Sequence, residues 1–180
     1  MKLISIGVFL IFELLLNSCQ SEPSLQKYFV ENSENSDFIA LDISPTILKI
    51  QETKLRADQV KALKSFDKMN VLAFKCNGKN QAEYEVERLK VNALLKDQKY
   101  QQLMRFGSGK NGASVNFVGE DEHINEFVLY ANTTENGFAI VRVLGKDMSP
   151  TNILTMISIL KDAQLDLEQL KPLQAMMPKL

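Results

Sequence analysis

Apolar residues recur every three or four positions in four segments of the chain, the spacing that gathers them on one face of a helix. These segments cover residues 24–30, 57–66, 80–96 and 151–160. The third is the clearest, with Tyr84 and Leu89 on its apolar side and charged residues spread over the rest. Ser24 is the first residue of the first segment and Ser149-Pro150 precedes the last, and these residue types favour the start of a helix. The pattern therefore predicts four helices.

Short runs rich in β-branched and aromatic residues predict strands between and after these helices. They cover residues 38–43, 71–74, 101–106, 114–118, 126–131 and 138–144. The run 71–74 (VLAF) is apolar at every position, which indicates a buried strand. Gly- or Asn-bearing connections at 107–112, 119–125 and 132–137 join the last four runs. Connections of this length and composition are typical of an antiparallel meander.

The order of these elements predicts an α+β fold. We expect a mostly antiparallel sheet of about five to six strands with helices packed on one face, and the other face solvated or used for binding. A further short helix is expected over 46–50, after Ser44-Pro45. The Leu- and Met-rich end, 164–180, contains two prolines that weaken it as one continuous helix. With 180 residues, the chain has room for a single domain, placed at 24–180.

The one long apolar run lies at the N-terminus. Lys2 precedes a largely apolar stretch of ten residues at 3–12, and three leucines extend the run beyond Glu13. A transmembrane helix needs about 20 apolar residues, so this run is too short to span a bilayer. We therefore expect a cleaved export signal over 1–18.

The stretch Leu16-Asn17-Ser18-Cys19 resembles the bacterial lipobox, in which a peptidase cuts just before a cysteine that carries lipid. Asn17 and Glu13 depart from the commonest form of that pattern. The cysteine thiol accepts diacylglycerol, and each methylene of buried chains such as palmitate contributes about 0.8 kcal/mol to membrane affinity. We expect lipidation at Cys19, followed by a short tether over 19–23. The alternatives are a plain secretory signal with an incidental cysteine and an uncleaved N-terminal helix.

Charge and cysteine content narrow the classes of partner. The chain has 21 basic and 22 acidic residues, a net charge of −1, and no cluster of Lys and Arg interleaved with aromatic residues. Nucleic acid is therefore not an expected partner. The two cysteines are Cys19 and Cys76, and lipidation of the first leaves the second without a disulfide partner.

Two long stretches, in addition to the lipobox, carry a family resemblance. With FIALDISPTILKI (38–50) and VNFVGEDEHINEFVLYANTTENGFAIVRVLGKDMSPTNILTMI (115–157), the chain resembles small Bacteroidetes lipoproteins grouped as a domain of unknown function. The resemblance implies an envelope protein of a Gram-negative bacterium, sometimes encoded near extracytoplasmic sigma-factor systems. It implies no catalytic residue. Gln20 and Ser21 after the cysteine differ from the Asp-type inner-membrane retention signal, so we expect the outer membrane.

Residues 119–126 (GEDEHINE) combine four acidic residues with His123, the single histidine of the chain. A metal site would need further ligands at defined spacing, and a charged hairpin loop is the favoured interpretation. Cys76 would need His123 as its base to act as a nucleophile, so a half-buried structural thiol at a strand end is favoured. GSGKNG at 107–112 lacks the strand-to-helix context of a phosphate-binding loop, and a hairpin turn is favoured. We therefore expect no catalytic residue, metal or cofactor.

These observations lead to one main functional hypothesis and two alternatives. The main hypothesis is a non-enzymatic, lipid-anchored envelope domain that binds a protein or other envelope component through its exposed sheet face or its apolar C-terminal segment. One alternative is an envelope hydrolase or metal-dependent enzyme centred on His123. The other is a structural or chaperone-like lipoprotein, which the adaptable thioethers of Met176 and Met177 permit.

Overall fold

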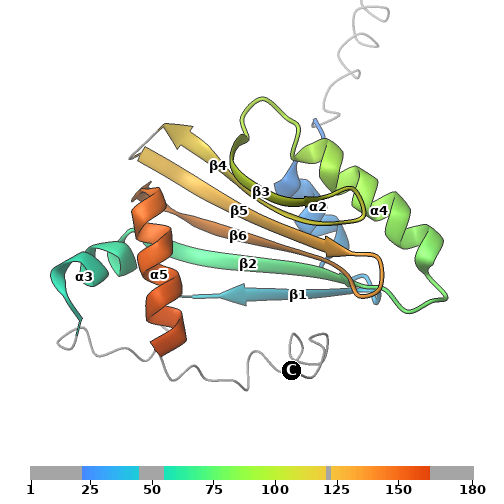
Figure 1. Ribbon diagram of the computed structural model, residues 1–180, viewed down its shortest axis with the longest axis horizontal. Coiled ribbons are helices and arrows are strands. Elements are labelled where there is room, and N and C mark those ends of the chain that lie inside the picture. Colours follow the sequence, from blue (N-terminus) through green and yellow to red (C-terminus); the bar gives the residue numbers. More distant parts are fainter. Residues whose placement is uncertain (1–21, 45–54, 121–122, 163–180) are drawn as a thin grey trace, which may run out of the picture.

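The computed structural model describes residues 22–44, 55–120 and 123–162 (Figure 1). The predicted signal at 1–18, Cys19, most of the tether, the short helix at 46–50 and the segment 164–180 lie outside the described residues. Within them, the chain forms four helices and six strands. The helices are α2 (Leu25–Asn32), α3 (Ala57–Lys64), α4 (Gln81–Leu94) and α5 (Pro150–Asp162). The strands are β1 (Phe38–Ile43), β2 (Phe66–Lys75), β3 (Gln101–Ser108), β4 (Asn111–Glu120), β5 (His123–Thr133) and β6 (Gly137–Met148).

The six strands form one sheet in the order β1-β2-β6-β5-β4-β3, and every neighbouring pair is antiparallel. Strands β3 to β6 follow one another as a meander, and β2 pairs with the outer side of β6 (Figure 1). The predicted α+β class and the antiparallel meander are therefore confirmed. The prediction that helix 57–66 reaches Phe66 is wrong, since α3 ends at Lys64 and Phe66 begins β2.

The register across the sheet separates its two faces, because directly opposed residues point to the same side. One face carries the row Ala40, Leu72, Ile140, Tyr130, Ser114 and Arg105. The next row belongs to the opposite face and consists of Leu41, Val71, Val141, Leu129, Val115 and Met104. Both rows are apolar across the centre of the sheet, so both faces need cover.

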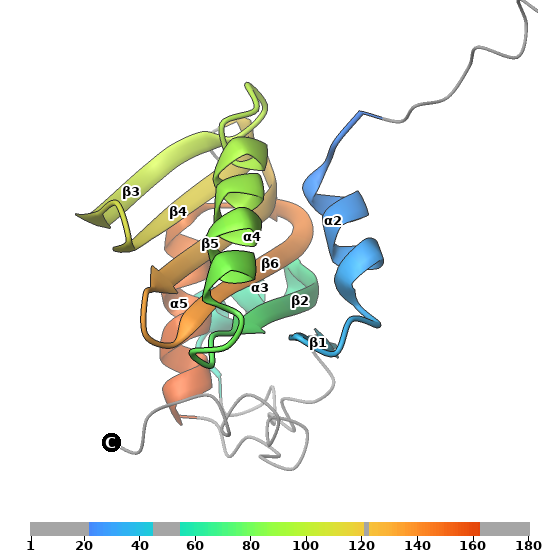
Figure 2. The ribbon, with the colours of Figure 1, turned by 90° about the vertical axis from the view of Figure 1, so that its right-hand side faces the viewer.

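Helices cover both faces of the sheet (Figure 2). Residues of α2 and α4 pack with Leu72, Phe74 and Ile140, whereas residues of α3 and α5 pack with Phe66 and Val143. The expectation of helices on one face only is therefore wrong. Helices are needed on both faces because apolar residues at successive positions of β2 point alternately to the two sides of the sheet.

The face under α2 and α4 holds an aromatic cluster. Phe74 stacks on Phe138 with ring centroids 5.6 Å apart, and Phe38 meets Phe74 edge-on at 5.2 Å. Tyr84 of α4 lies 6.3 Å from Phe138 and is fully buried, so it fixes the helix on the sheet. The Tyr28 hydroxyl of α2 donates a hydrogen bond to the Glu87 carboxylate of α4 at 2.8 Å, which ties the two helices together.

A buried ion pair lies on the same face, under α2. The Arg142 Nε atom on β6 donates to Oε1 of Glu126 on β5 at 2.7 Å, and the two side chains are 6% and 13% exposed. The same guanidinium donates to the Gln26 amide oxygen and stacks over the Phe29 ring at 5.3 Å. One side chain thus connects the two central strands of the sheet, β5 and β6, to helix α2.

We expect Arg142→Met to destabilise the domain by about 3–5 kcal/mol, because it leaves the Glu126 carboxylate buried without its partner. The measurement is the free energy of unfolding from urea titrations. Arg56→Met, in an exposed pair with Asp58, is the matched control and should change it little. Equal losses in the two variants would contradict the structural role of Arg142. Replacing both partners, Arg142→Met with Glu126→Leu, should recover much of the loss.

Candidate functional site

His123 lies at the exposed start of β5. Its Nδ1 atom is 2.8 Å from Oδ1 of Asp147, and the two side chains are 78% and 76% exposed. Within residues 22–44, 55–120 and 123–162, no group of three or more His, Cys, Asp or Glu side chains is placed to hold a metal ion. Asp121 and Glu122 lie outside those ranges. A His–Asp pair this exposed to water contributes little to the stability of the fold.

Cys76 follows β2 and is buried. Its thiol donates a hydrogen bond to the Gln81 side-chain oxygen at 3.0 Å, and its backbone N–H bonds to Asn136 beside the start of β6. His123 pairs with Asp147 at the other end of β6, a 12-residue strand on the order of 40 Å long. The structure therefore keeps Cys76 and His123 apart, and they do not form the nucleophile–base pair considered from the sequence.

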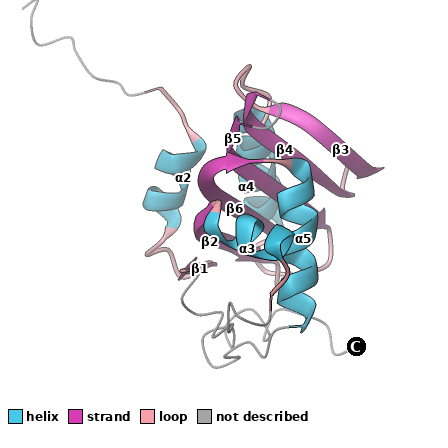
Figure 3. Cartoon of the chain, turned by 90° about the vertical axis from the view of Figure 1, so that its left-hand side faces the viewer, coloured by secondary structure: helices cyan, strands magenta, loops and turns pink. Residues whose placement is uncertain are grey.

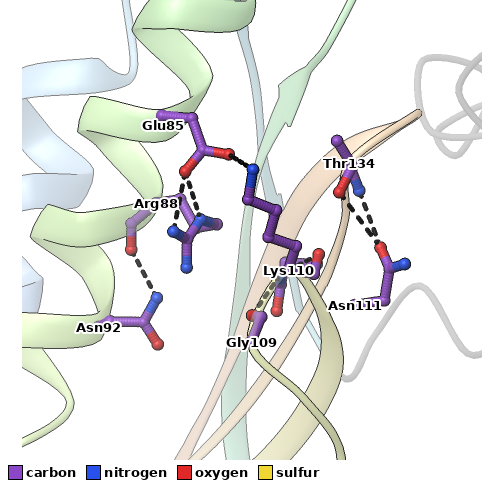
Figure 4. A network of polar contacts seen from close by, with 8 residues as sticks. Glu85, Arg88, Asn92, Gly109, Lys110, Asn111 and Thr134 are labelled. Atoms are coloured by element: carbon purple, nitrogen blue, oxygen red, sulfur yellow. Dashed lines mark hydrogen bonds and ion pairs between the residues drawn. The ribbon is translucent and has the colours of Figure 1, made fainter.

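The GSGKNG stretch forms the turn between β3 and β4, as predicted. Gly107 has a φ of 65°, and a Cβ atom there would lie 2.5 Å from the backbone oxygen of Asn111. Only glycine fits this position without displacing the neighbouring strand. The turn lies beside α4, where the Lys110 ammonium is 3.6 Å from the Glu85 carboxylate (Figure 4).

Strand β3 is an exposed edge of the described sheet. It pairs only with β4, and every residue from Gln101 to Gly107 is exposed. Among them are the large apolar side chains of Leu103, Met104 and Phe106, the last 62% exposed. Figures 2 and 3 show this strand at the margin of the sheet, beyond the helices. An uncovered edge with apolar side chains is suited to pairing with another strand.

A groove of about 280 Å³ lies between α4 and the strands β3, β4 and β5. It exists because side chains facing α4 become smaller toward the edge of the sheet. The row under the start of the helix runs Phe74, Phe138, Asn132, Gly112 and Gly107. Helix α4 rests on the large aromatic residues, so the glycines and Ser114 leave space between the helix and the outer strands.

Basic side chains line this groove. Arg88 and Lys96 come from α4 and the turn after it, and Arg105 comes from β3 on the face that α4 covers. None of the described residues that line the groove is acidic. Arg88 donates from Nε and Nη2 to one oxygen of Glu85, at 3.1 and 2.8 Å (Figure 4). This pairing lowers the pKa of Glu85 and raises that of Arg88.

The inner wall of the groove contains the buried side chain of Tyr130. Burial raises the pKa of its hydroxyl, while the nearby Arg88 charge and Asn92 amide act in the opposite direction. The hydroxyl nonetheless makes no hydrogen bond to the described residues. A buried polar group without a partner is uncommon in folded proteins and marks a position where a ligand or water can bind.

Fold and groove together define a small α+β domain with a basic groove beside its exposed edge strand. The chain belongs to the family described as a domain of unknown function, DUF4252, which it matches over residues 28–156. That range contains all six strands and the whole groove. No curated protein and no solved structure matches the chain. Within the described part of the chain, no helix is both long and apolar enough to cross a membrane.

Local sequence pattern alone does not reveal the groove. Along the sequence, Arg88 belongs to the charged side of a helix, and Tyr130 is one apolar position of a strand. The available signal is the combination of small residues on β4, Gly112 and Ser114, with a helix that carries Arg88 and is followed by Lys96. That signal becomes visible only with the register between β3, β4 and β5, which the sequence pattern leaves open.

We expect the Cys76 thiol to react slowly with a thiol reagent such as Ellman's reagent in the folded protein, because it is buried and hydrogen-bonded to Gln81. Reaction should become fast in denaturing urea. The measurement uses Cys19→Ser chains, so that Cys76 is the one thiol present. Rapid reaction without denaturant would instead indicate an activated thiolate and would favour the alternative that the protein is an envelope enzyme.

Proposed function

We propose that this chain is a lipid-anchored protein of the cell envelope whose domain binds a partner protein along strand β3. The exposed β3 edge is the observation that carries the binding role. The apolar run at 3–12 and the lipobox-like Leu16-Asn17-Ser18-Cys19 support the anchor. In this proposal the domain is a binding module that the lipid at Cys19 holds at the outer membrane.

The partner segment should be an extended chain that adds a strand to β3. An edge strand presents unpaired backbone N–H and C=O groups, which supply affinity to any extended peptide. Met104 and Phe106 lie in rows with Val115 and Ala113, so both side chains project from the face opposite α4. Apolar side chains at alternate positions of the partner strand would pack against them and provide selectivity.

The position of the proposed anchor is compatible with this role. Ser24 caps α2 by accepting a hydrogen bond from the Lys27 backbone N–H at 3.2 Å, so the ordered domain begins within a few residues of Cys19. A tether of five residues spans at most about 18 Å. The domain would therefore stay close to the membrane surface, and the proposed partner would have to be accessible there.

Labelling with radioactive palmitate tests the anchor. We expect the label in the parent chain and in Cys76→Ser, and its loss in Cys19→Ser, because only Cys19 would carry the lipid. The two variants make the same Cys→Ser change, so they are matched controls. A Cys19→Ser chain that keeps both the label and the membrane association of the parent would contradict the lipid anchor.

A photo-crosslinking side chain placed at Phe106 tests the edge strand. In whole cells we expect a discrete adduct with an envelope protein, and no such adduct from the equally exposed Leu154 on α5. Met104→Lys should remove the adduct by placing a charge in the apolar contact, whereas Val30→Lys on α2 should not. Identical adducts from Phe106 and Leu154, or an adduct of two copies of this chain, would overturn the proposal.

A further inference from the structure

Several basic side chains line the groove between α4 and strands β3 to β5, and some of them have no acidic partner among the described residues. Lys96 and Arg105 make no ion pair with any described residue. Arg88 and Lys110 both pair with a single acid, Glu85. One negative charge therefore faces two cations before Lys96 and Arg105 are counted, so the groove is left with an excess of positive charge.

Two hydrogen-bond donors in the groove are held in place by the fold but have no acceptor among the described residues. The two bonds from Arg88 to Glu85 use Nε and Nη2, which leaves Nη1 as a donor without an acceptor among the described residues. Tyr130 is 4% exposed, and its buried hydroxyl also lacks a hydrogen-bond partner among the described residues. Donors that are held in place but unused are suited to an oxyanion, whose oxygens accept several hydrogen bonds at once.

We propose that this groove binds a phosphate group, carried by a soluble small molecule or by a phospholipid head. Arg88, Lys96 and Arg105 would contact the phosphate oxygens, and the Tyr130 hydroxyl would donate to one of them. A phosphate group offers more acceptor oxygens around one centre than a carboxylate does, so it matches several convergent donors better. The volume of about 280 Å³ is at the lower limit of small-molecule pockets, which suits a head group rather than a large ligand.

This site is separate from the docking edge proposed above. Arg105 shares its row with Ser114 and Tyr130 on the α4 side, whereas Met104 and Phe106 project from the other side of β3. Phosphate binding and partner binding therefore use opposite faces of the same strand. Phe106 also borders the groove, but the side chains proposed to contact phosphate, those of Arg88, Lys96, Arg105 and Tyr130, have no role in the proposed docking edge. Either proposal can therefore fail without the other.

The direct test is isothermal titration calorimetry of inorganic phosphate into the purified full chain in nonionic detergent. We expect saturable binding, weakened about tenfold by Arg105→Gln, because one charge-assisted hydrogen bond is lost. Arg105 is exposed, so this variant should keep the parent's melting temperature. Arg56→Gln, at the start of α3, makes the same charge change away from the groove and should leave the affinity unchanged. No saturable binding, or equal weakening in both variants, overturns the proposal.

Tyr130→Phe separates a ligand-binding role from a structural one. The hydroxyl makes no hydrogen bond in the described structure, so its removal should leave the melting temperature unchanged or raise it. The same variant should bind phosphate several-fold more weakly. A lower melting temperature with unchanged phosphate affinity would assign the hydroxyl to folding and contradict its role in the groove.

Competition experiments identify the kind of molecule that carries the phosphate and test whether the groove selects phosphate over other anions. At equal phosphate concentration, stronger competition by phosphatidylglycerol-doped micelles than by glycerol 3-phosphate assigns a lipid head group, and the reverse assigns a soluble phosphate ester. Both results support the phosphate site. Acetate that competes as well as inorganic phosphate would show a general anion site and overturn the assignment.

Discussion

The fold depends on one constraint: the central strands of the sheet are apolar on both faces, so both faces must be removed from water. Burying apolar surface stabilises the folded state by roughly 25 cal/mol per Å². In β2, Val71, Leu72, Ala73 and Phe74 are all buried, which requires a helix layer on each side. Helices α2 and α4 meet this requirement on one side, and α3 and α5 meet it on the other.

The same constraint explains where polar groups collect. Under α4 the facing positions of β2 and β6 are apolar, at Leu72, Phe74, Phe138 and Ile140, but on β4 they are Gly112, Ser114 and Asn116. Asn116 donates a hydrogen bond to Ser114 at 3.1 Å, so these buried polar groups partly satisfy each other. Where the apolar rows end, the helix no longer packs closely, and the space that remains is lined by basic side chains from α4 and β3.

Local sequence pattern predicted the elements that are long and strongly periodic. The helix expected over 80–96 is α4 at Gln81–Leu94, and the four strands of the meander follow in the expected order. The end of α3 was misplaced because Phe66 fits both a helical apolar face and the first position of a strand. Its place in β2 is set by a shift in register between Phe66 and Lys68, which turns its ring toward α5.

By itself, the sequence determined the α+β class, the meander and its turns, because these follow from hydrophobic period and from glycine at Gly107 and its neighbours. Only the tertiary structure decided which faces the helices cover, how far His123 lies from Cys76, and that Arg88, Arg105 and Tyr130 meet in one groove. Those features depend on strand register and helix placement. They bring together residues far apart in the chain, so no local pattern records them.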